Sequence, residues 1–404
     1  MMNIIFLGGF FPEDVLKEVV SKSKQVVQNA SNNFQWAFIN GLKQNLNNGL
    51  TLITAPFIGY YPFYYSDLYF QNSYFSFDNK SENVIVGFLN VPVLKNIFKY
   101  YNIHKHLNQN CSKYLENNVI IIYSLNLAYL AAAFKVKKNN PSIKVYLIIT
   151  DLPDYPADCS LFYRLYLKYI EKKFVYDCIH KADGFVLLTD KMAKHLPISN
   201  KPWVRVEGLY DVSSETDCSN FKKEEYKTIL YTGTLDFRYG ITNLLDAFNQ
   251  IKEDNYRLWI CGGGVGQEAV VKACEKDSRI KYFGTVGKQK IIELQKKATI
   301  LVNPRNNLGD YNSFSFPSKT MEYFASGTPT LLYRLDGIPQ EYFQYCYTID
   351  DNSIVSFTEA IKNVLKKTPL ELEEKGKKAR NFILNTKTSF IQCKKVIDMI
   401  NNYK

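Results

Sequence analysis

The sequence has 404 residues, of which 46% are hydrophobic, and its formal net charge is +11 because 50 Lys and Arg outnumber 39 Asp and Glu. This length predicts two domains of about 200 residues with sizeable cores, and the lack of any apolar run of about 18 residues argues against an integral membrane protein. The basic excess favours an anionic partner, which can be a phosphorylated substrate, an anionic lipid surface or a nucleic acid.

The beginning of the chain and its eight cysteines indicate a cytoplasmic protein. Residues 4–7 are apolar, and this run is too short for a secretion signal, so residues 3–7 predict a first strand that ends at Gly8 and Gly9. No two cysteines have Cys-x-x-Cys spacing, so neither a zinc ribbon nor a redox motif is signalled. Several cysteines lie in apolar segments, which is typical of reduced, buried thiols.

Residues 1–206 are expected to form one α/β domain, because short apolar strands alternate with helices. Asp151 lies two residues beyond the end of one of these strands, at the sheet edge where ligands bind in such domains. Its carboxylate can orient a substrate hydroxyl, or it can simply cap a turn or a helix. The predicted strands cover residues 3–7, 50–54, 84–89, 118–123, 143–149 and 184–188, and the predicted helices cover 34–42, 127–136, 161–179 and 191–195.

A polar linker region, residues 207–227, precedes a second α/β domain that we expect over 228–375. The remaining residues, 376–404, are mostly charged and predict a helical tail that can pack back on the first domain. Within the second domain the predicted strands cover residues 228–231, 257–261, 280–283, 298–303 and 329–333, and the predicted helices cover 243–250, 267–275 and 288–297.

The most informative stretch is residues 312–330, which reads as a loop and a short helix between two strands. The helix is expected to begin near Pro317, with Ser315 or Ser318 as its cap, and to end at Gly327. Its free amides and its dipole can hold a phosphate. Glu322, one turn inside, can accept hydrogen bonds from the two hydroxyls of a ribose. The alternative is a helix that only packs, with one exposed Glu.

These residues carry a resemblance to a known family. The order Leu-Val-Asn-Pro304, a loop, and then Ser-Phe-Pro-Ser-Lys-Thr-Met-Glu322 resembles the donor-binding segment of the family-4 glycosyltransferases. The turns at 231–240, 261–264 and 282–286 match the family in order and spacing, so the resemblance is strong over about 228–345. It implies the GT-B fold, in which two Rossmann-like parallel-sheet domains face a cleft, and is closest to bacterial enzymes of capsule, exopolysaccharide and O-antigen synthesis.

The resemblance implies a nucleotide-sugar donor held mainly by the second domain. Glu322 matches the second Glu of the family's Glu-x7-Glu pattern and should bind the ribose, whereas the first Glu falls at Phe314, which leaves the identity of the sugar open. Arg238 and Lys319 are the cations expected at the diphosphate, where they would stabilise the departing charge; for each, the alternative is a solvated side chain. The donor site should also include Gly233, Ser315, Phe316, Val286, Gly8 and Gly9.

The same resemblance implies a hexosyltransferase that retains the anomeric configuration, with the donor phosphate taking the acceptor's proton. Relatives often carry His-Asp where this chain has Thr150 and Asp151, so Asp151 is the candidate catalytic residue. No Asp-x-Asp triplet and no His-Glu-x-x-His occurs, so we predict no metal and no cofactor besides the nucleoside-diphosphate sugar. The expected acceptor is a glycan, which can be linked to a polyprenyl diphosphate.

A lipid-linked acceptor would place the protein on the inner face of the plasma membrane. Arg164, Lys168 and Lys172 recur at helical spacing, and aromatic residues cluster at 60–65, which fits docking on an anionic membrane. The alternative is a solvated helix face and a core loop. No nucleic-acid motif appears. Two other functions stay open: a non-hydrolysing nucleotide-sugar epimerase, and a degenerate GT-B protein that only binds a glycan or a partner.

Overall fold

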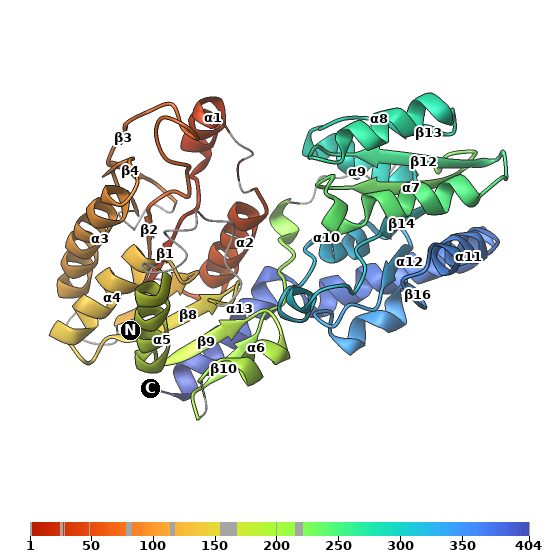
Figure 1. The fold of residues 1–404 in the computed structure, drawn as a ribbon. Helices are drawn as coiled ribbons and strands as arrows, with labels where there is room; N and C mark the ends of the chain where they lie inside the picture. Colours follow the sequence, from red (N-terminus) through yellow and green to blue (C-terminus); the bar gives the residue numbers. More distant parts are fainter. Residues whose placement is uncertain are drawn as a thin grey trace. The chain divides into compact units, whose positions relative to one another are not determined.

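The computed structural model describes residues 2–24, 27, 29–47, 49–77, 83–113, 118–153, 168–198, 200–214 and 221–403. The chain divides into two compact units (Figure 1). Unit 1 comprises Met1–Leu209 together with Ser389–Lys404, and unit 2 comprises Tyr210–Thr388. The boundary after unit 2 therefore lies at residue 388, later than residue 375, where the sequence analysis placed the end of the second domain.

Unit 1 is built on a sheet whose strand order is β10-β9-β8-β7-β1-β2-β5-β4. Neighbouring strands run parallel except β4, which is antiparallel to β5. The strands that follow β1 in the chain are added on one side of it, from β2 to β5. The chain then crosses to the other side of β1 and adds β7 to β10 there, so a topological switch point lies between β1 and β7. The strands are β1 (Asn3–Gly8), β2 (Leu50–Thr54), β4 (Ser73–Phe75), β5 (Asn83–Ile85), β7 (Asn118–Tyr123), β8 (Lys144–Ile149), β9 (Gly184–Leu187) and β10 (Trp203–Arg205).

Helices cover both faces of this sheet, because β1 and β7 bury alternate side chains on opposite sides. On one face, α2 and α13 pack together over Ile4, Phe6 and Ile121. On the other, α3 packs against α4. The helices are α1 (Glu13–Lys22), α2 (Asn29–Asn45), α3 (Leu94–Lys113), α4 (Leu127–Asn139), α5 (Lys168–Lys181), α6 (Asp190–His195) and α13 (Ser389–Asn402), and β3 (Tyr69–Phe70) pairs with β6 (Phe88–Leu89).

Unit 2 contains a parallel sheet with the strand order β13-β12-β11-β14-β15-β16. In chain order within the unit this is 3-2-1-4-5-6, the order of a dinucleotide-binding Rossmann domain, and its switch point lies between β11 and β14. The strands are β11 (Lys227–Thr232), β12 (Tyr256–Cys261), β13 (Ile280–Tyr282), β14 (Ile300–Asn303), β15 (Thr330–Tyr333) and β16 (Tyr347–Ile349).

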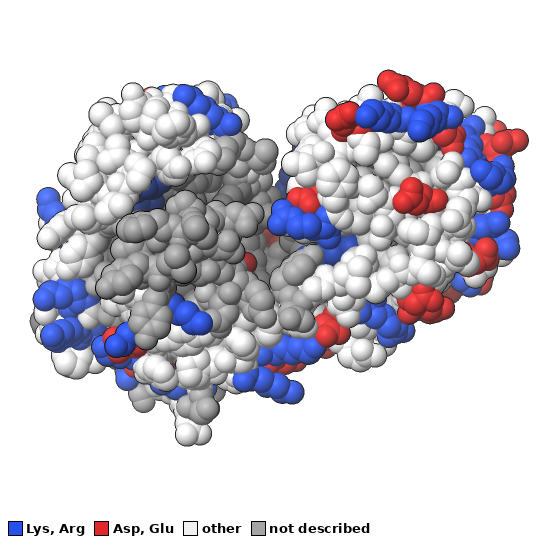
Figure 2. Space-filling view, in the orientation of Figure 1, with Lys and Arg blue, Asp and Glu red and all other residues white. Residues whose placement is uncertain are grey.

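The helices of unit 2 also enclose their sheet from both sides. One core cluster joins α7, α11 and α12 to the face that carries Ile229, and a smaller cluster joins α9 to the face that carries Leu230. The helices are α7 (Ile241–Gln250), α8 (Gln267–Lys276), α9 (Lys288–Lys297), α10 (Lys319–Ser326), α11 (Ile354–Leu365) and α12 (Pro369–Thr386). Figure 2 shows acidic and basic side chains mixed along the outer edge of this unit.

The predicted helical tail consists of two helices that belong to different units. α12 packs on α10 within unit 2, where Gly376 leaves no room for a side chain beside the carbonyl of Gly327. α13 packs on α2 within unit 1, where Gly41 lies against the backbone of Ser389 and the thiol of Cys393. The tail is thus divided at residue 388, and the part that joins unit 1 is α13.

The α/β architecture that the sequence predicted is confirmed, with several elements added. The elements that were not predicted are α1, α3, α11, β3, β4, β10 and β16, and the strand predicted over 84–89 is two short strands, β5 and β6. Residues 161–167 of the predicted helix at 161–179, including Arg164, lie outside the described residues, and so does the side chain of Lys168. Ile170, in the part of this helix that the structure describes, is exposed. Six described cysteines are free thiols, and five of them are buried.

Candidate functional site

Three loops meet at the carboxyl edge of the unit 2 sheet, beside its switch point. They follow β11, β12 and β14, and glycines hold them together. Gly262, with a φ of +133°, has no space for a Cβ because the carbonyl of Gly233 lies there. Gly240, with a φ of +79°, is pressed in the same way against the carbonyl of Pro304. Only glycine combines these backbone angles with such close approach, so the loops form one fixed edge.

Lys319, the first residue of α10, brings a positive charge to this edge. Its Cε and Nζ lie against Gly233, where the side chain of any other residue would overlap them. The Lys319 side chain is half-buried, and desolvation lowers its pKa, with the negative charge of Glu322 acting in the opposite direction. Gly233 and Lys319, both predicted as donor-binding residues, are thus adjacent. Glu322 lies one turn further along α10 and is exposed.

A buried hydroxyl fixes α10 to the end of β11. The Tyr323 hydroxyl accepts a hydrogen bond from the Thr232 amide at 2.9 Å and lies 3.2 Å from the Thr232 carbonyl, to which it can donate. Tyr323 is fully buried, and burial raises the pKa of its phenol. The bond explains how the strand that leads to Gly233 and the helix that carries Lys319 keep their relative positions.

Arg238 lies in the loop after β11, in a short 3-10 helix (Phe237–Tyr239). Its guanidinium donates to the Asp236 carboxylate at 2.8 and 3.1 Å, and its side chain is 73% exposed. The bonds from Arg238 hold the pKa of Asp236 below its ordinary value. Arg238 therefore already has a carboxylate partner, unlike Lys319, which makes no ion pair with any residue that the structure describes.

The loop after β14 is held by an arginine that the sequence analysis missed. Arg305 donates from Nε to Asn312 Oδ1 and from Nη2 to Ser315 Oγ, both at 2.8 Å. Ser315 therefore accepts from Arg305. Ser318 takes the N-cap position of α10, as predicted, but its side chain makes no capping bond. The signal available in the sequence was an Arg two residues beyond the end of a predicted strand. Its partners Asn312 and Ser315 could not be predicted, because they lie seven and ten residues away.

The remaining predicted residues of unit 2 lie around these loops. Phe316 is buried, with its ring 5.4 Å from that of Tyr342, so only its backbone can reach a ligand. Val286 is half-buried and packs on the cluster that contains Tyr323. Phe314 ends a 3-10 helix (Asp310–Phe314) and is half-buried. Among the described residues, no group of three or more His, Cys, Asp or Glu could hold a metal ion.

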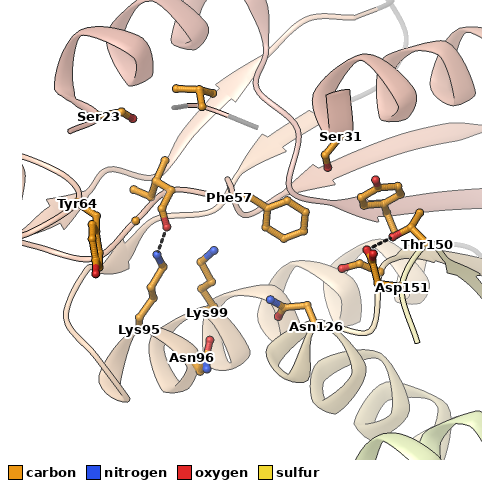
Figure 3. Close-up of a pocket in the computed structure, with 15 residues that line it drawn as sticks. Ser23, Ser31, Phe57, Tyr64, Lys95, Asn96, Lys99, Asn126, Thr150 and Asp151 are labelled. Atoms are coloured by element: carbon orange, nitrogen blue, oxygen red, sulfur yellow. Dashed lines mark hydrogen bonds between the residues drawn. The ribbon is translucent and has the colours of Figure 1, made fainter. Parts of the chain in front are cut away.

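Unit 1 has a cavity of about 550 Å³ at the carboxyl edge of its sheet, beside the switch point (Figure 3). Its walls come from the segments after β2, β7 and β8 and from α3. A cavity of this size holds a small polar molecule. The wall includes Ser31, Phe57, Ile58, Tyr64, Lys95, Asn96, Lys99, Tyr123, Ser124, Asn126, Thr150 and Asp151.

Asp151, the predicted catalytic residue, lies in the wall of this cavity and is exposed. Its carboxylate accepts a hydrogen bond from the Thr150 hydroxyl at 3.0 Å. Burial, with a smaller contribution from the charge of Asp151, raises the pKa of neighbouring Tyr123 to about 12. The site thus combines a carboxylate, hydroxyls and the Asn126 amide, which are groups that bind sugar hydroxyls.

Gly8 and Gly9 lie at the end of β1 and are both buried. The Gly9 amide donates to Gln35 Oε1 at 2.9 Å, and the ring of Phe57 occupies the space that a Cβ at Gly9 would need. Phe57 also lines the cavity, so the glycines bring its ring to the wall. Gly8 and Gly9 were predicted to contact the donor. Because the Gly9 amide is already bonded, any such contact would use other backbone groups of the two glycines.

Residues 213–387 match the family model described as glycosyl transferases group 1, so unit 2 carries a domain of that type. A lipopolysaccharide outer core galactosyltransferase, WaaB, superposes with a TM-score of 0.63 at 13% identity and 100% coverage of both chains. An E. coli trehalose-6-phosphate structure bound with UDP-2-fluoro glucose gives 0.67 at 9% identity, covering 98% of this chain and 99% of that one. A trehalose-6-phosphate synthase, studied for glycosyltransfer with retention, gives 0.66 at 10%, covering 99% of each chain.

These likenesses confirm the predicted GT-B fold, and together with the domain match they support a glycosyltransferase. Comparison with curated protein sequences gave no match. In the part of the chain that the structure describes, no helix combines the length and the apolar character that crossing a membrane requires.

Proposed function

We propose that the protein is a retaining glycosyltransferase that moves a hexosyl group from a nucleoside-diphosphate sugar to a glycan acceptor. The observation that supports it is the pair on α10 at the unit 2 switch point: a partly desolvated ammonium, Lys319, packed on Gly233, and an exposed carboxylate, Glu322, one turn away. A cation suits a diphosphate, and a carboxylate suits the hydroxyls of a ribose.

In the proposed reaction unit 2 holds the donor and unit 1 holds the acceptor. Lys319 would stabilise the diphosphate as it departs, because its negative charge grows in the transition state. The backbone amides of Ser315 and Phe316 would approach the sugar, and Arg238 would contribute if it exchanged Asp236 for the diphosphate. The acceptor's proton would pass to the donor phosphate while Asp151 orients the acceptor. The protein would thus need neither a nucleophile of its own, nor a metal ion, nor a cofactor.

The comparisons agree with this proposal in two respects. One neighbour of the same fold was solved with UDP-2-fluoro glucose, a nucleotide sugar, and another was studied for transfer with retention. Both statements concern those proteins. For this chain they favour a nucleotide-sugar donor and a retained anomeric configuration, which NMR of the product would assign.

The decisive experiment is donor turnover with a matched variant. A panel of nucleotide sugars is incubated with the protein, with and without EDTA, and free nucleoside diphosphate is measured together with calorimetric donor affinity. Glu322→Ala should weaken donor binding about 10- to 150-fold, because hydrogen bonds to a charged group contribute about 1.5 to 3 kcal/mol. Glu275→Ala, an exposed Glu on α8, is the control. Unchanged donor affinity in Glu322→Ala would remove this residue from the site.

The same panel tests the proposal that the protein only binds a ligand. Phe314, at the position where the resemblance places a sugar-binding Glu, is the observation that favours it. A wild-type protein that binds a nucleotide sugar tightly but releases no nucleoside diphosphate, with any acceptor offered, would support a binding module and contradict the transferase.

We further propose that the acceptor belongs to a bacterial surface glycan, such as a capsule or O-antigen, and is presented by a polyprenyl diphosphate at the inner face of the plasma membrane. In support, exposed apolar side chains follow one another at the start of α3, beside the unit 1 cavity, and Lys172 of the predicted basic stripe is exposed. They are Val93, Leu94, Ile97, Phe98 and Tyr101.

Sedimentation with liposomes tests the membrane proposal. Wild-type protein should sediment with vesicles of anionic lipid at low salt, and the double variant Ile97→Ser/Phe98→Ser should remain in the supernatant. Val355→Ser, which changes an exposed apolar residue of unit 2, should behave as wild type. Equal recovery of wild-type protein in the supernatant with neutral and anionic vesicles would contradict membrane binding.

A further inference from the structure

Two lysines of α3, one helical turn apart, extend into the unit 1 cavity (Figure 3). The Lys99 ammonium donates to the carbonyls of Ala55 and Pro56, both at 2.9 Å, and lies 4.2 Å from the centre of the Phe88 ring. The Lys95 ammonium donates to the carbonyl of Ile58. Since an ammonium has three donors, one N–H of Lys99 and two of Lys95 are not used by these bonds.

Neither ammonium has a carboxylate partner among the described residues. Asp151 is the only acidic side chain that contributes to the described cavity wall. Burial lowers the pKa of Lys95 to about 8 and that of Lys99 well below its ordinary value, and the charge of Lys95 lowers the latter further. Carbonyl dipoles orient both amino groups without neutralising them, and burial disfavours the protonated form of each. An anion bound between them would favour that form on both lysines.

The cavity wall away from α3 has a different character. Asn126, Thr150 and Asp151 supply an amide, a hydroxyl and a carboxylate, and the Phe57 ring lies between them and the lysines (Figure 3). The Phe57 ring is itself supported by Tyr129, with ring centres 5.8 Å apart in a stacked geometry. The cavity therefore has a cationic end, an apolar ring in the middle and an end suited to hydroxyls.

We propose that this cavity binds an acceptor that carries an anionic group, a phosphate or a carboxylate, which lies at Lys95 and Lys99 while its hydroxyls face Asn126 and Asp151. That the bound molecule is the acceptor of a transfer reaction rests on the proposed function. That the cavity binds a sugar with an anionic group does not depend on the proposed function. A neutral sugar would supply no counter-charge to either lysine, and the bonds to the carbonyls of residues 55–58 leave N–H groups of both lysines for an anion.

Ligand-observed NMR titration of the full chain tests this inference without any donor. The probes are glucuronate, methyl phosphate and, as the neutral control, glucose. Wild-type protein should bind at least one anionic probe more tightly than glucose, and more weakly as salt is raised. Lys95→Met should weaken that binding about tenfold, a change typical of losing one hydrogen bond to a charged group, while Lys95→Arg should retain most of it.

Two controls complete the design. Lys105→Met removes an exposed charge from the same helix and should change nothing. Lys319→Met identifies binding in unit 2: if it abolishes anion binding while Lys95→Met does not, the inference is wrong. It is also wrong if Lys95→Met, shown to be folded by circular dichroism, binds both anions as wild type does, or if wild type binds neither. Preference for methyl phosphate indicates a phosphate-bearing acceptor, and preference for glucuronate an acidic sugar. One outcome would refute this inference and leave the proposed function intact. In it, wild-type protein turns over a donor and Glu322→Ala does not, but wild-type protein binds neither anionic probe.

Discussion

Lys319→Met should weaken donor binding and leave the fold as stable as before or more stable. The two effects have opposite signs because the ammonium is partly desolvated beside Gly233 and its pKa is lowered, so the folded protein holds that charge at a cost. A bound diphosphate would supply the missing counter-charge. Replacing the ammonium by a methionine of similar length removes both the cost and the ligand contact.

The expected loss of affinity follows from the contact itself. One hydrogen bond from a charged donor contributes about 1.5 to 3 kcal/mol, so the dissociation constant for the nucleoside diphosphate should rise about 10- to 150-fold. Calorimetry with UDP, GDP, ADP, CDP and TDP identifies the nucleotide that wild type binds, and the variant is then measured with that nucleotide. Lys276→Met, an exposed lysine of α8, is the matched control.

Stability against pH provides the second measurement. Because the pKa of Lys319 is lower in the folded protein than the ordinary 10.5, the unfolded chain binds more protons between these two values. Stability from this group should therefore rise with pH up to about 10.5, and Lys319→Met should lose that rise, as seen in urea titrations. Wild-type nucleotide affinity in Lys319→Met would refute the diphosphate contact, and a large loss of stability at neutral pH would show that the ammonium is structural.

Three further substitutions test how the fold supports the sites. Gly262→Ala must adopt a φ of +133° and displace the Gly233 carbonyl, so we expect unit 2 to lose about 2 kcal/mol or more in urea unfolding; an unchanged midpoint would contradict the close packing of the loops. Tyr323→Phe leaves the buried Thr232 amide without its acceptor and should cost about 1 to 3 kcal/mol, with Tyr403→Phe, an exposed tyrosine, as the control. Gly41→Ala should separate α13 from α2, seen as faster hydrogen exchange in α13; unchanged protection would show that the backbone adapts.

The sequence predicted best those elements whose burial matches a simple pattern. Residues 50–54 and 118–123 were predicted as strands to the residue, because short, largely apolar runs rich in β-branched residues mark buried strands. Helix α9 was likewise predicted over 288–297. Helix α3 was missed because its pattern is mixed: it exposes Ile97, Phe98 and Tyr101, and it buries Lys99 and Asn110 together with Ile103 and Leu107. Apolar periodicity is weak in a helix that has apolar and polar side chains on both of its faces.

Most residues of the proposed donor site in unit 2 were predicted from the sequence, whereas the two lysines of the unit 1 cavity were not. Gly233, Lys319 and Glu322 lie in short segments with recognisable order, and the switch point brings the first two together. Lys95 and Lys99 depend on the carbonyls of residues 55–58, some forty positions away. Contacts of that kind are set by how α3 crosses the sheet edge, so no local pattern announces them.

The lysines of the two sites indicate more specifically than the net charge of +11 which anionic partners the protein binds. Surface pairs such as Lys272 with Glu268 neutralise themselves and are screened by water, so they say little about a partner. Lys319 in unit 2 and Lys95 and Lys99 in unit 1 differ, since each is desolvated at the carboxyl edge of a sheet without an ion-pair partner among the described residues. Cations kept at a cost at both switch points favour small anionic ligands, one for each unit, over a broad anionic surface.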